Sequence, residues 1–73
     1  MYHVKNIGES NWRDRKYMVI RDCRNEEAPN DGWWYYCTCN SLTLAQEALN
    51  EIGNGLIVET SEVEPVDIHR HLI

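Results

Sequence analysis

Long apolar runs and an apolar leader are both absent from this sequence. It contains no stretch of about 18 consecutive apolar residues, so we expect no membrane-spanning helix. Its first residues, Met-Tyr-His-Val-Lys-Asn, lack the apolar centre of a secretory signal peptide. The two absences together predict a cytoplasmic protein.

Cysteine occurs in an odd number, which argues against a disulfide-stabilised secreted domain. The three cysteines are Cys23, Cys37 and Cys39, whereas such a domain normally has an even number at wider spacings. We therefore predict free thiols in a reducing compartment.

No internal repeat, low-complexity tract or catalytic signature occurs either. We therefore predict a non-enzymatic protein without a cofactor or a small-molecule substrate. Residues 1–73 form one small domain, and a chain of this size buries only about 60% of the surface that its unfolded form exposes. Large apolar side chains are therefore needed for the core before they are available for function.

The net charge of −5 is divided unevenly along the chain. Residues 1–24 carry six basic and three acidic residues, a net of +3, whereas residues 25–73 carry nine acidic residues and one basic residue, a net of −8. Such a chain presents an acidic side that is attracted to basic surfaces and repels most nucleic acid. The same charges also favour solubility, and the sequence does not separate these two roles.

Two runs of strand-forming residues predict a β-hairpin. The first spans residues 16–24, with the consecutive apolar residues Tyr-Met-Val-Ile, and the second spans residues 33–40. The turn residues Pro-Asn-Asp-Gly at positions 29–32 lie between them. A weak alternation near the start predicts an edge strand followed by a loop within residues 1–14.

The hydrophobic period changes after the hairpin. Apolar residues at positions 44, 45, 48, 49 and 52 form the stripe of an amphipathic helix with one buried face. Thr43 is the predicted N-cap, with Gln46 as its capping-box partner. Gly53 or Gly55 is expected to end the helix.

A further strand follows the helix, beginning with the apolar residues 56–58 and ending by Pro65. We expect it to run parallel to a strand that precedes the helix. The order β-β-α-β, with the N-terminal strand added, predicts an α+β fold. This fold is a two-layer sandwich in which one helix covers one face of a three- or four-stranded sheet. Residues 67–73 are a tail whose pattern predicts no element.

The segment Gly-Trp-Trp-Tyr-Tyr-Cys-Thr-Cys-Asn at positions 32–40 concentrates aromatic residues on one predicted strand. Because side chains alternate between the faces of a strand, one face carries Trp33, Tyr35, Cys37 and Cys39. The other face carries Trp34, Tyr36, Thr38 and Asn40. We expect the first face to lie under the helix, since it ends in small apolar cysteines, and the second to face away.

The other predicted strands are also apolar on both sides, although a single helix covers only one face of the sheet. Two explanations remain open. In the first, Trp12 and Tyr2 from the N-terminal segment, or Ile68, Leu72 and Ile73 from the tail, close the second face. In the second, this face stays partly open as a contact site, because apolar patches and the residue types Trp, Tyr and Arg are typical of interfaces.

Two cysteines and two histidines invite comparison with a zinc site. Cys37 and Cys39 lie about 6.5 Å apart along an extended strand, which is too far for two ligands of one tetrahedral ion. We therefore expect no metal at these cysteines or at His69 and His71, and we interpret the thiols as small core residues. Cys39 lies just before the helix, but no general base accompanies it, so the pattern does not predict a nucleophile.

The run Thr-Leu-Ala-Gln-Glu-Ala-Leu at positions 43–49 follows the predicted hairpin and precedes a short strand. In this layout, which covers residues 16–66, the chain resembles small host-takeover proteins of tailed phages, in particular phage inhibitors of bacterial RNA polymerase. Several anti-CRISPR and anti-restriction proteins share the plan. The resemblance implies a phage-encoded, non-enzymatic protein that binds host transcription machinery in the host cytoplasm and inhibits or redirects it. The acidic half of the chain would then face a basic groove that normally holds nucleic acid.

We expect the contact to be made by aromatic residues that the helix leaves uncovered and by charges around them. Trp34, Tyr36 and Arg21 are the candidates on the sheet face, since these residue types dominate interface hot spots. The acidic residues Glu26, Glu27 and Asp31 of the hairpin loop are the candidates for electrostatic steering. The expected partner is a protein assembly, with RNA polymerase as the first candidate, and not nucleic acid or a membrane.

The alternative function is binding of single-stranded nucleic acid or RNA. Aromatic sheet faces stack bases, and clustered basic side chains contact phosphates. The basic cluster consists of Arg13, Arg15, Lys16, Arg21 and Arg24. The net charge of −8 in residues 25–73 argues against this alternative.

Overall fold

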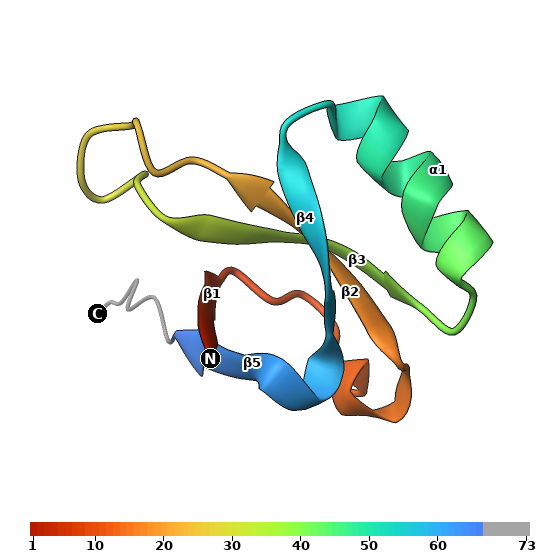
Figure 1. The fold of residues 1–73 in the computed structure, drawn as a ribbon. Coiled ribbons are helices and arrows are strands. Elements are labelled where there is room, and N and C mark those ends of the chain that lie inside the picture. Colours follow the sequence, from red (N-terminus) through yellow and green to blue (C-terminus); the bar gives the residue numbers. More distant parts are fainter. Residues whose placement is uncertain (67–73) are drawn as a thin grey trace.

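The computed structural model describes residues 1–66 and has one α-helix packed on a mixed sheet of five strands (Figure 1). The elements in chain order are β1 (Tyr2–Lys5), the 3-10 helix η1 (Trp12–Asp14), β2 (Tyr17–Asp22), β3 (Trp33–Cys39), α1 (Leu42–Ile52), β4 (Gly55–Glu59), the 3-10 helix η2 (Thr60–Glu62) and β5 (Val63–Val66). The predicted α+β class is confirmed, although the sheet has more strands than expected.

The central part of the sheet agrees with the sequence pattern. β2 and β3 form the predicted antiparallel hairpin, and β4 pairs antiparallel with β2 on its other side. Consequently β4 runs parallel to β3, the strand that precedes the helix, as expected.

The two ends of the chain depart from the prediction. β1 is not an edge strand, because it pairs in parallel with both β3 and β5. The segment expected to be one strand ending by Pro65 is divided into β4, η2 and β5, and β5 continues through Pro65 to Val66. Proline is tolerated there because β5 lies at the edge of the sheet, where one side of the strand needs no hydrogen-bond donor.

The sheet curls until its two edges approach at one end. Its strand order is β4-β2-β3-β1-β5, so β4 and β5 are the edges. In a flat sheet with strands about 4.8 Å apart, these edges would lie about 19 Å from each other. However, only the three residues of η2 separate them, and this connection spans about 14 Å at most. Figure 1 shows the short turn of η2 between the end of β4 and the start of β5.

The curl gives the sheet an inner face, which encloses the main core, and an outer face, which carries α1. The buried residues of the inner core are Val4, Trp12, Met18, Ile20, Val58 and Val63. Tyr2 and Ile7 pack against this core, and Trp12 is only 7% exposed. The explanation in which Trp12 and Tyr2 close the face of the sheet that lacks the helix is therefore confirmed, although this face carries Trp33 and Tyr35 and not Trp34 and Tyr36. Ile68, Leu72 and Ile73 lie outside the described residues.

The N-cap of the helix lies two residues before the predicted one. Ser41, and not Thr43, is the N-cap, because its Oγ accepts a hydrogen bond of 3.3 Å from the backbone N–H of Leu44. Gly53 ends the helix with a φ of 75°, a conformation that glycine adopts at low cost. Ala45 is buried against the sheet, whereas Leu44, which was expected on the buried stripe, is 55% exposed.

A β-bulge in the hairpin overturns the predicted distribution of the aromatic side chains. Cys37 lies opposite Val19 and Tyr35 lies opposite Ile20, which leaves Tyr36 as an extra residue in β3. An extra residue interrupts the strict alternation of side chains between the two faces of a strand.

As a result, the residues of β3 before the bulge lie on the opposite faces from those predicted, whereas the residues after it lie on the predicted faces. Trp33 and Tyr35 pack on the inner core and not under the helix. Trp34 lies opposite Arg21 on the outer face, and Tyr36 reaches Glu51 of the helix, so neither faces away from it. Cys37 and Cys39 lie on the helix side, as expected, because they follow the bulge.

Candidate functional site

The outer face beside α1 brings together the three candidates Trp34, Tyr36 and Arg21. Arg21 is the cross-strand neighbour of Trp34, and its guanidinium carbon lies 5.4 Å from the centre of the Tyr36 ring. The Tyr36 hydroxyl donates a hydrogen bond of 2.9 Å to Glu51, which raises the pKa of Tyr36. Arg21 is exposed, and both aromatic side chains are half-buried. This group therefore forms an aromatic and cationic patch that the helix covers incompletely.

Next to this patch, the loop between β2 and β3 projects from the end of the sheet (Figure 1). The loop is closed by two backbone hydrogen bonds between Cys23 and Gly32, of 2.8 and 3.0 Å. Two turns shape it, with bonds from Glu26 N–H to the Cys23 carbonyl and from Asn30 N–H to the Glu27 carbonyl. The loop is therefore built on its own backbone bonds, although most of its residues are exposed.

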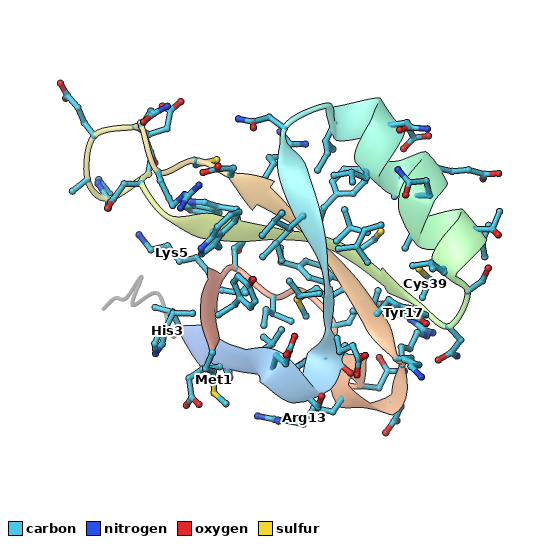
Figure 2. The ribbon with its side chains drawn as sticks, in the orientation of Figure 1. Met1, His3, Lys5, Arg13, Tyr17 and Cys39 are labelled. Carbon is cyan, nitrogen blue, oxygen red and sulfur yellow. The ribbon has the colours of Figure 1, made fainter. Side chains whose placement is uncertain are left out.

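Two side chains from the sheet hold the loop from below. The ammonium group of Lys5 donates to the carbonyl oxygens of Pro29, at 3.1 Å, and Asp31, and it lies 3.6 Å from the Asp31 carboxylate. The Nε1–H of Trp34 donates a bond of 2.7 Å to the carbonyl of Asn30. Figure 2 shows Lys5 at the base of the projecting loop. Trp34 thus belongs both to the patch and to the support of the loop.

An open pocket of about 380 Å³ lies between the patch and the loop. Its walls are formed by Asn6, Arg21, Cys23, Glu26, Asn30, Trp34 and Tyr35. Arg21 and Glu26 place opposite charges on this wall, and Trp34 adds an aromatic surface. This combination suits a polar side chain or a short peptide segment of a partner.

The three acidic candidates of the β2–β3 loop, Glu26, Glu27 and Asp31, lie in different surroundings. Glu26 lines the pocket, and Glu27 is exposed at the tip of the loop. Asp31 is half-buried and turned toward Lys5, so its charge is partly compensated. The structure thus brings Glu26 next to Trp34 and Arg21, leaves Glu27 toward solvent, and gives Asp31 a role in holding the loop.

A pairing of cations with aromatic rings was missed at the sequence level. Each of five basic side chains lies over an aromatic ring, with the cation 4.3 to 6.0 Å from the ring centre. The pairs are Lys5–Trp34, Arg13–Trp12, Lys16–Tyr17, Arg21–Tyr36 and Arg24–Trp33. The clustering of basic residues in residues 1–24 and of aromatic residues in residues 32–40 was the available signal, but which cation meets which ring depends on the strand register.

A polar cluster on the inner face was also missed. The Glu9 carboxylate accepts hydrogen bonds from the hydroxyls of Tyr35 and Thr38, and from Arg15 at 3.1 Å. The bond from Tyr35 is the largest cause that lowers the pKa of Glu9. Burial, followed by the bond to Glu9, raises the pKa of Tyr35 to about 12. Because its polar groups bind one another, this cluster fastens the N-terminal segment to β3 and offers no free acid or base.

The cysteines carry no sign of activation. Burial raises the pKa of the Cys37 thiol, which lowers its content of thiolate, the reactive form. The Cys39 thiol donates to the carbonyl of Ser41 at 3.5 Å, at the start of α1, where Figure 2 also shows Tyr17. Within residues 1–66, no three potential metal ligands gather in one place, and His69 and His71 lie outside that range.

No α-helix formed by residues 1–66 combines the length and the apolar character needed to cross a membrane. Comparisons of the chain with models of known protein families, with curated proteins and with solved structures found no match. The proposals below therefore depend on the geometry of the chain itself.

Proposed function

We propose that this chain is a non-enzymatic, protein-binding regulator, and that its contact surface is the patch of Trp34, Tyr36 and Arg21 together with the β2–β3 loop. The observation that carries the proposal is the position of Trp34, which is half-buried on the patch and also donates to the Asn30 carbonyl of the loop. An aromatic residue that is held in place yet remains accessible is typical of interface hot spots.

The rigidity of the surface supports this proposal. Lys5 holds the loop through the carbonyl oxygens of Pro29 and Asp31 and through the side-chain carboxylate of Asp31, so the loop is ordered before a partner binds. A surface that is ordered in advance loses less conformational entropy on binding. The adjacent pocket adds a concave element into which a side chain of the partner fits.

The charge of the loop indicates the kind of partner. Glu26 and Glu27 are exposed and form no ion pair with another residue of the described chain. Carboxylates at the tip of a projecting loop attract a basic surface and accelerate its association. We propose bacterial RNA polymerase as the first partner to test, with the chain acting as a phage-encoded inhibitor in the host cytoplasm, because its nucleic-acid channel is basic and the resemblance noted above points to it.

The test is binding of the immobilised chain to purified bacterial RNA polymerase. We expect Trp34→Ala to raise the dissociation constant by about 30-fold, the effect of losing one hot spot. Glu62→Gln is the matched control, since Glu62 is exposed on η2, which follows the end of β4 opposite to the one that pairs with Arg21. This variant should leave binding within about twofold. Absence of binding by the wild-type chain would refute this partner.

A second experiment separates the surface from the identity of the partner. Bacterial lysate is passed over the wild-type chain and over Trp34→Ala, and the captured proteins are quantified side by side. A stoichiometric protein held by the wild type and lost with Trp34→Ala supports the surface. Equal capture by both chains would show that the binding surface lies elsewhere.

Binding of single-stranded nucleic acid is the second candidate, and the five cation–aromatic pairs favour it. However, two of the cations also pair with carboxylates, Lys5 with Asp31 and Arg24 with Asp22. Titration of labelled single-stranded DNA and RNA at low salt distinguishes the two functions, because phosphate contacts are strongest there. We expect no binding, and micromolar binding that weakens steeply with salt would favour the nucleic-acid function instead.

A further inference from the structure

The two edge strands of the sheet, β4 and β5, differ in how they are protected against pairing with a strand of another molecule. β5 carries Pro65, which blocks strand addition, and the exposed Glu64 beside it. β4 reads Gly-Leu-Ile-Val-Glu and contains neither proline nor lysine, the residues that usually protect an edge. β4 is therefore the edge that is open to pairing with another strand.

The backbone bonds of β4 show which of its groups point outward. The N–H of Asp22 donates to the carbonyl of Asn54, and the N–H of Thr60 donates to the carbonyl of Lys16. At both ends of the β2–β4 ladder, the residue on the β4 side that bonds to the β2 side therefore has an even number. In an antiparallel pair, only every second residue of a strand exchanges backbone hydrogen bonds with the neighbouring strand, and the residues between them point their N–H and carbonyl groups to the other side. The N–H and carbonyl groups of Gly55, Ile57 and Glu59 therefore point away from β2.

No loop of residues 1–66 covers this outward row with backbone hydrogen bonds. The side chains of the strand are accessible as well, since Leu56 is 37% exposed, Ile57 is half-buried and Glu59 is exposed. Unpaired backbone groups beside accessible apolar side chains are the usual requirement for strand addition.

We propose that the occupant of this edge is a second copy of the chain, with β4 pairing antiparallel to β4 of the second copy about a twofold axis at Ile57. In this register Ile57 faces Ile57, and Gly55 faces Glu59 of the second copy. Each outward residue thus meets another outward residue. The exposed Leu56 lies opposite Val58 of the second copy and loses solvent contact.

Charge complementarity is the reason to choose a second copy. Gly55 has Arg21 as its neighbour on β2, on the same face of the sheet as Glu59. Because Gly55 has no side chain, Glu59 of the second copy lies across it from Arg21, about 10 Å away between Cα atoms. The two extended side chains together bridge this distance, and the twofold axis forms the ion pair twice.

Repulsion between the two acidic chains does not oppose this register strongly. The Cα atoms of the two Glu59 residues lie about 14 Å apart, since four residues along the strand and the spacing between two strands separate them. This separation exceeds the screening length of about 8 Å at physiological salt. We expect a weak and concentration-dependent dimer, because pairing of single edge strands buries little surface.

The proposal is tested by exchanging charges between copies. In Arg21→Glu and in Glu59→Arg, each homodimer would place like charges opposite each other, so sedimentation equilibrium should show a dissociation constant at least about tenfold above the wild type. An equal mixture of the two variants restores both ion pairs. Native mass spectrometry should therefore show a heterodimer with an affinity within about threefold of the wild-type dimer.

A backbone variant tests the edge independently of charge. Among the backbone hydrogen-bonding groups, Ile57→Pro removes one outward N–H and none that bonds to β2, so we expect the β2–β4 ladder to remain while dimerisation is lost. Ile57→Val is the control that should still dimerise. A wild-type chain that remains at 8.6 kDa at millimolar concentration, a mixture that forms no heterodimer, or a folded Ile57→Pro that still dimerises would each overturn the proposal. None of these measurements involves a partner protein, so their failure leaves the proposed function standing.

Discussion

Lys5 on β1 contacts both the backbone carbonyl and the side-chain carboxylate of Asp31 in the β2–β3 loop. Its ammonium group donates a hydrogen bond to the Asp31 carbonyl oxygen and lies 3.6 Å from the carboxylate oxygen. The same group also bonds the carbonyl of Pro29 at 3.1 Å. A residue near the start of the chain therefore fixes the conformation of a loop 26 positions further along.

This relationship predicts that Lys5→Met loosens the loop without unfolding the domain. We expect the free energy of unfolding to fall by about 1 kcal/mol, because charge-assisted bonds to a half-exposed loop are partly replaced by water. Amide hydrogen exchange at Cys23 and Gly32, which close the loop, should become faster. Urea denaturation and hydrogen exchange measure the two effects.

Lys16→Met is the control for this experiment. Lys16 also lies over an aromatic ring, at 5.8 Å from the centre of Tyr17, but its side chain makes no hydrogen bond to the loop. The amide exchange of the loop should therefore remain at the wild-type rate. Equal loosening by both variants would show that Lys5 does not hold the loop specifically.

The hydrogen bond between Tyr35 and Glu9 predicts a dependence of stability on alkaline pH. The pKa of Tyr35 is raised to about 12, first by burial and then by the Glu9 carboxylate, from an ordinary value of 10.0. Between these two values the unfolded chain loses the phenolic proton while the folded chain keeps it. The free energy of unfolding should therefore fall as the pH rises from about 10 to about 12.

Two variants identify the origin of this effect. In Tyr35→Phe, the free energy of unfolding should no longer show the part of its fall between about pH 10 and pH 12 that the titration of Tyr35 causes. In Glu9→Gln the pKa of Tyr35 should fall but stay above its ordinary value, because burial is the larger cause. Absorbance titration of the phenolate together with urea denaturation at each pH provides the measurement, and an unchanged Tyr35 pKa in Glu9→Gln would contradict the assignment.

The parts of the fold that follow from short-range patterns were predictable from sequence. The hairpin and the helix each occupy one continuous segment with its own period, and Gly53 supplies the expected end of the helix. β5 was missed because its strand partner β1 lies at the other end of the chain. The curl of the sheet follows from that same distant pairing, so no local pattern announces it.

The candidate site was predicted in its composition but not in its geometry. Trp34 and Arg21 do lie together, yet the expected face was wrong because one extra residue, Tyr36, interrupts the alternation of β3. A bulge depends on the register between two strands, and the sequence of one strand does not contain it. Lys5 and Glu9 were missed because the loop residue Asp31, which Lys5 holds, and the β3 residue Thr38, which binds Glu9, lie 26 and 29 positions away along the chain.

Cysteine reactivity offers a further prediction. Burial raises the pKa of Cys37, so at neutral pH this thiol should react more slowly with a disulfide reagent in the folded chain than in urea. Mass spectrometry after timed labelling resolves the three cysteines separately. Faster labelling of Cys37 in the folded chain than in urea would contradict the protection of this half-buried thiol by the fold.

Gly55, at the start of β4, is expected to be the glycine that the fold tolerates least in substituted form. A Cβ at this position would lie 2.1 Å from the carbonyl oxygen of Ile20 and 3.0 Å from the side chain of Ile52. The first of these atoms belongs to the backbone of β2, so it cannot rotate away. Relief requires β4 to move away from β2, which breaks the ladder that joins them.

We therefore expect Gly55→Ala to lower the free energy of unfolding by about 3 kcal/mol or more, as forced overlap in a packed region does. Gly53→Ala is the matched control, because no atom lies within 4 Å of its added Cβ and only the φ of 75° opposes it. That substitution should cost about 1 kcal/mol. Urea denaturation of both variants gives the comparison, and equal losses would mean that β4 does not approach β2 as closely as the structure places it.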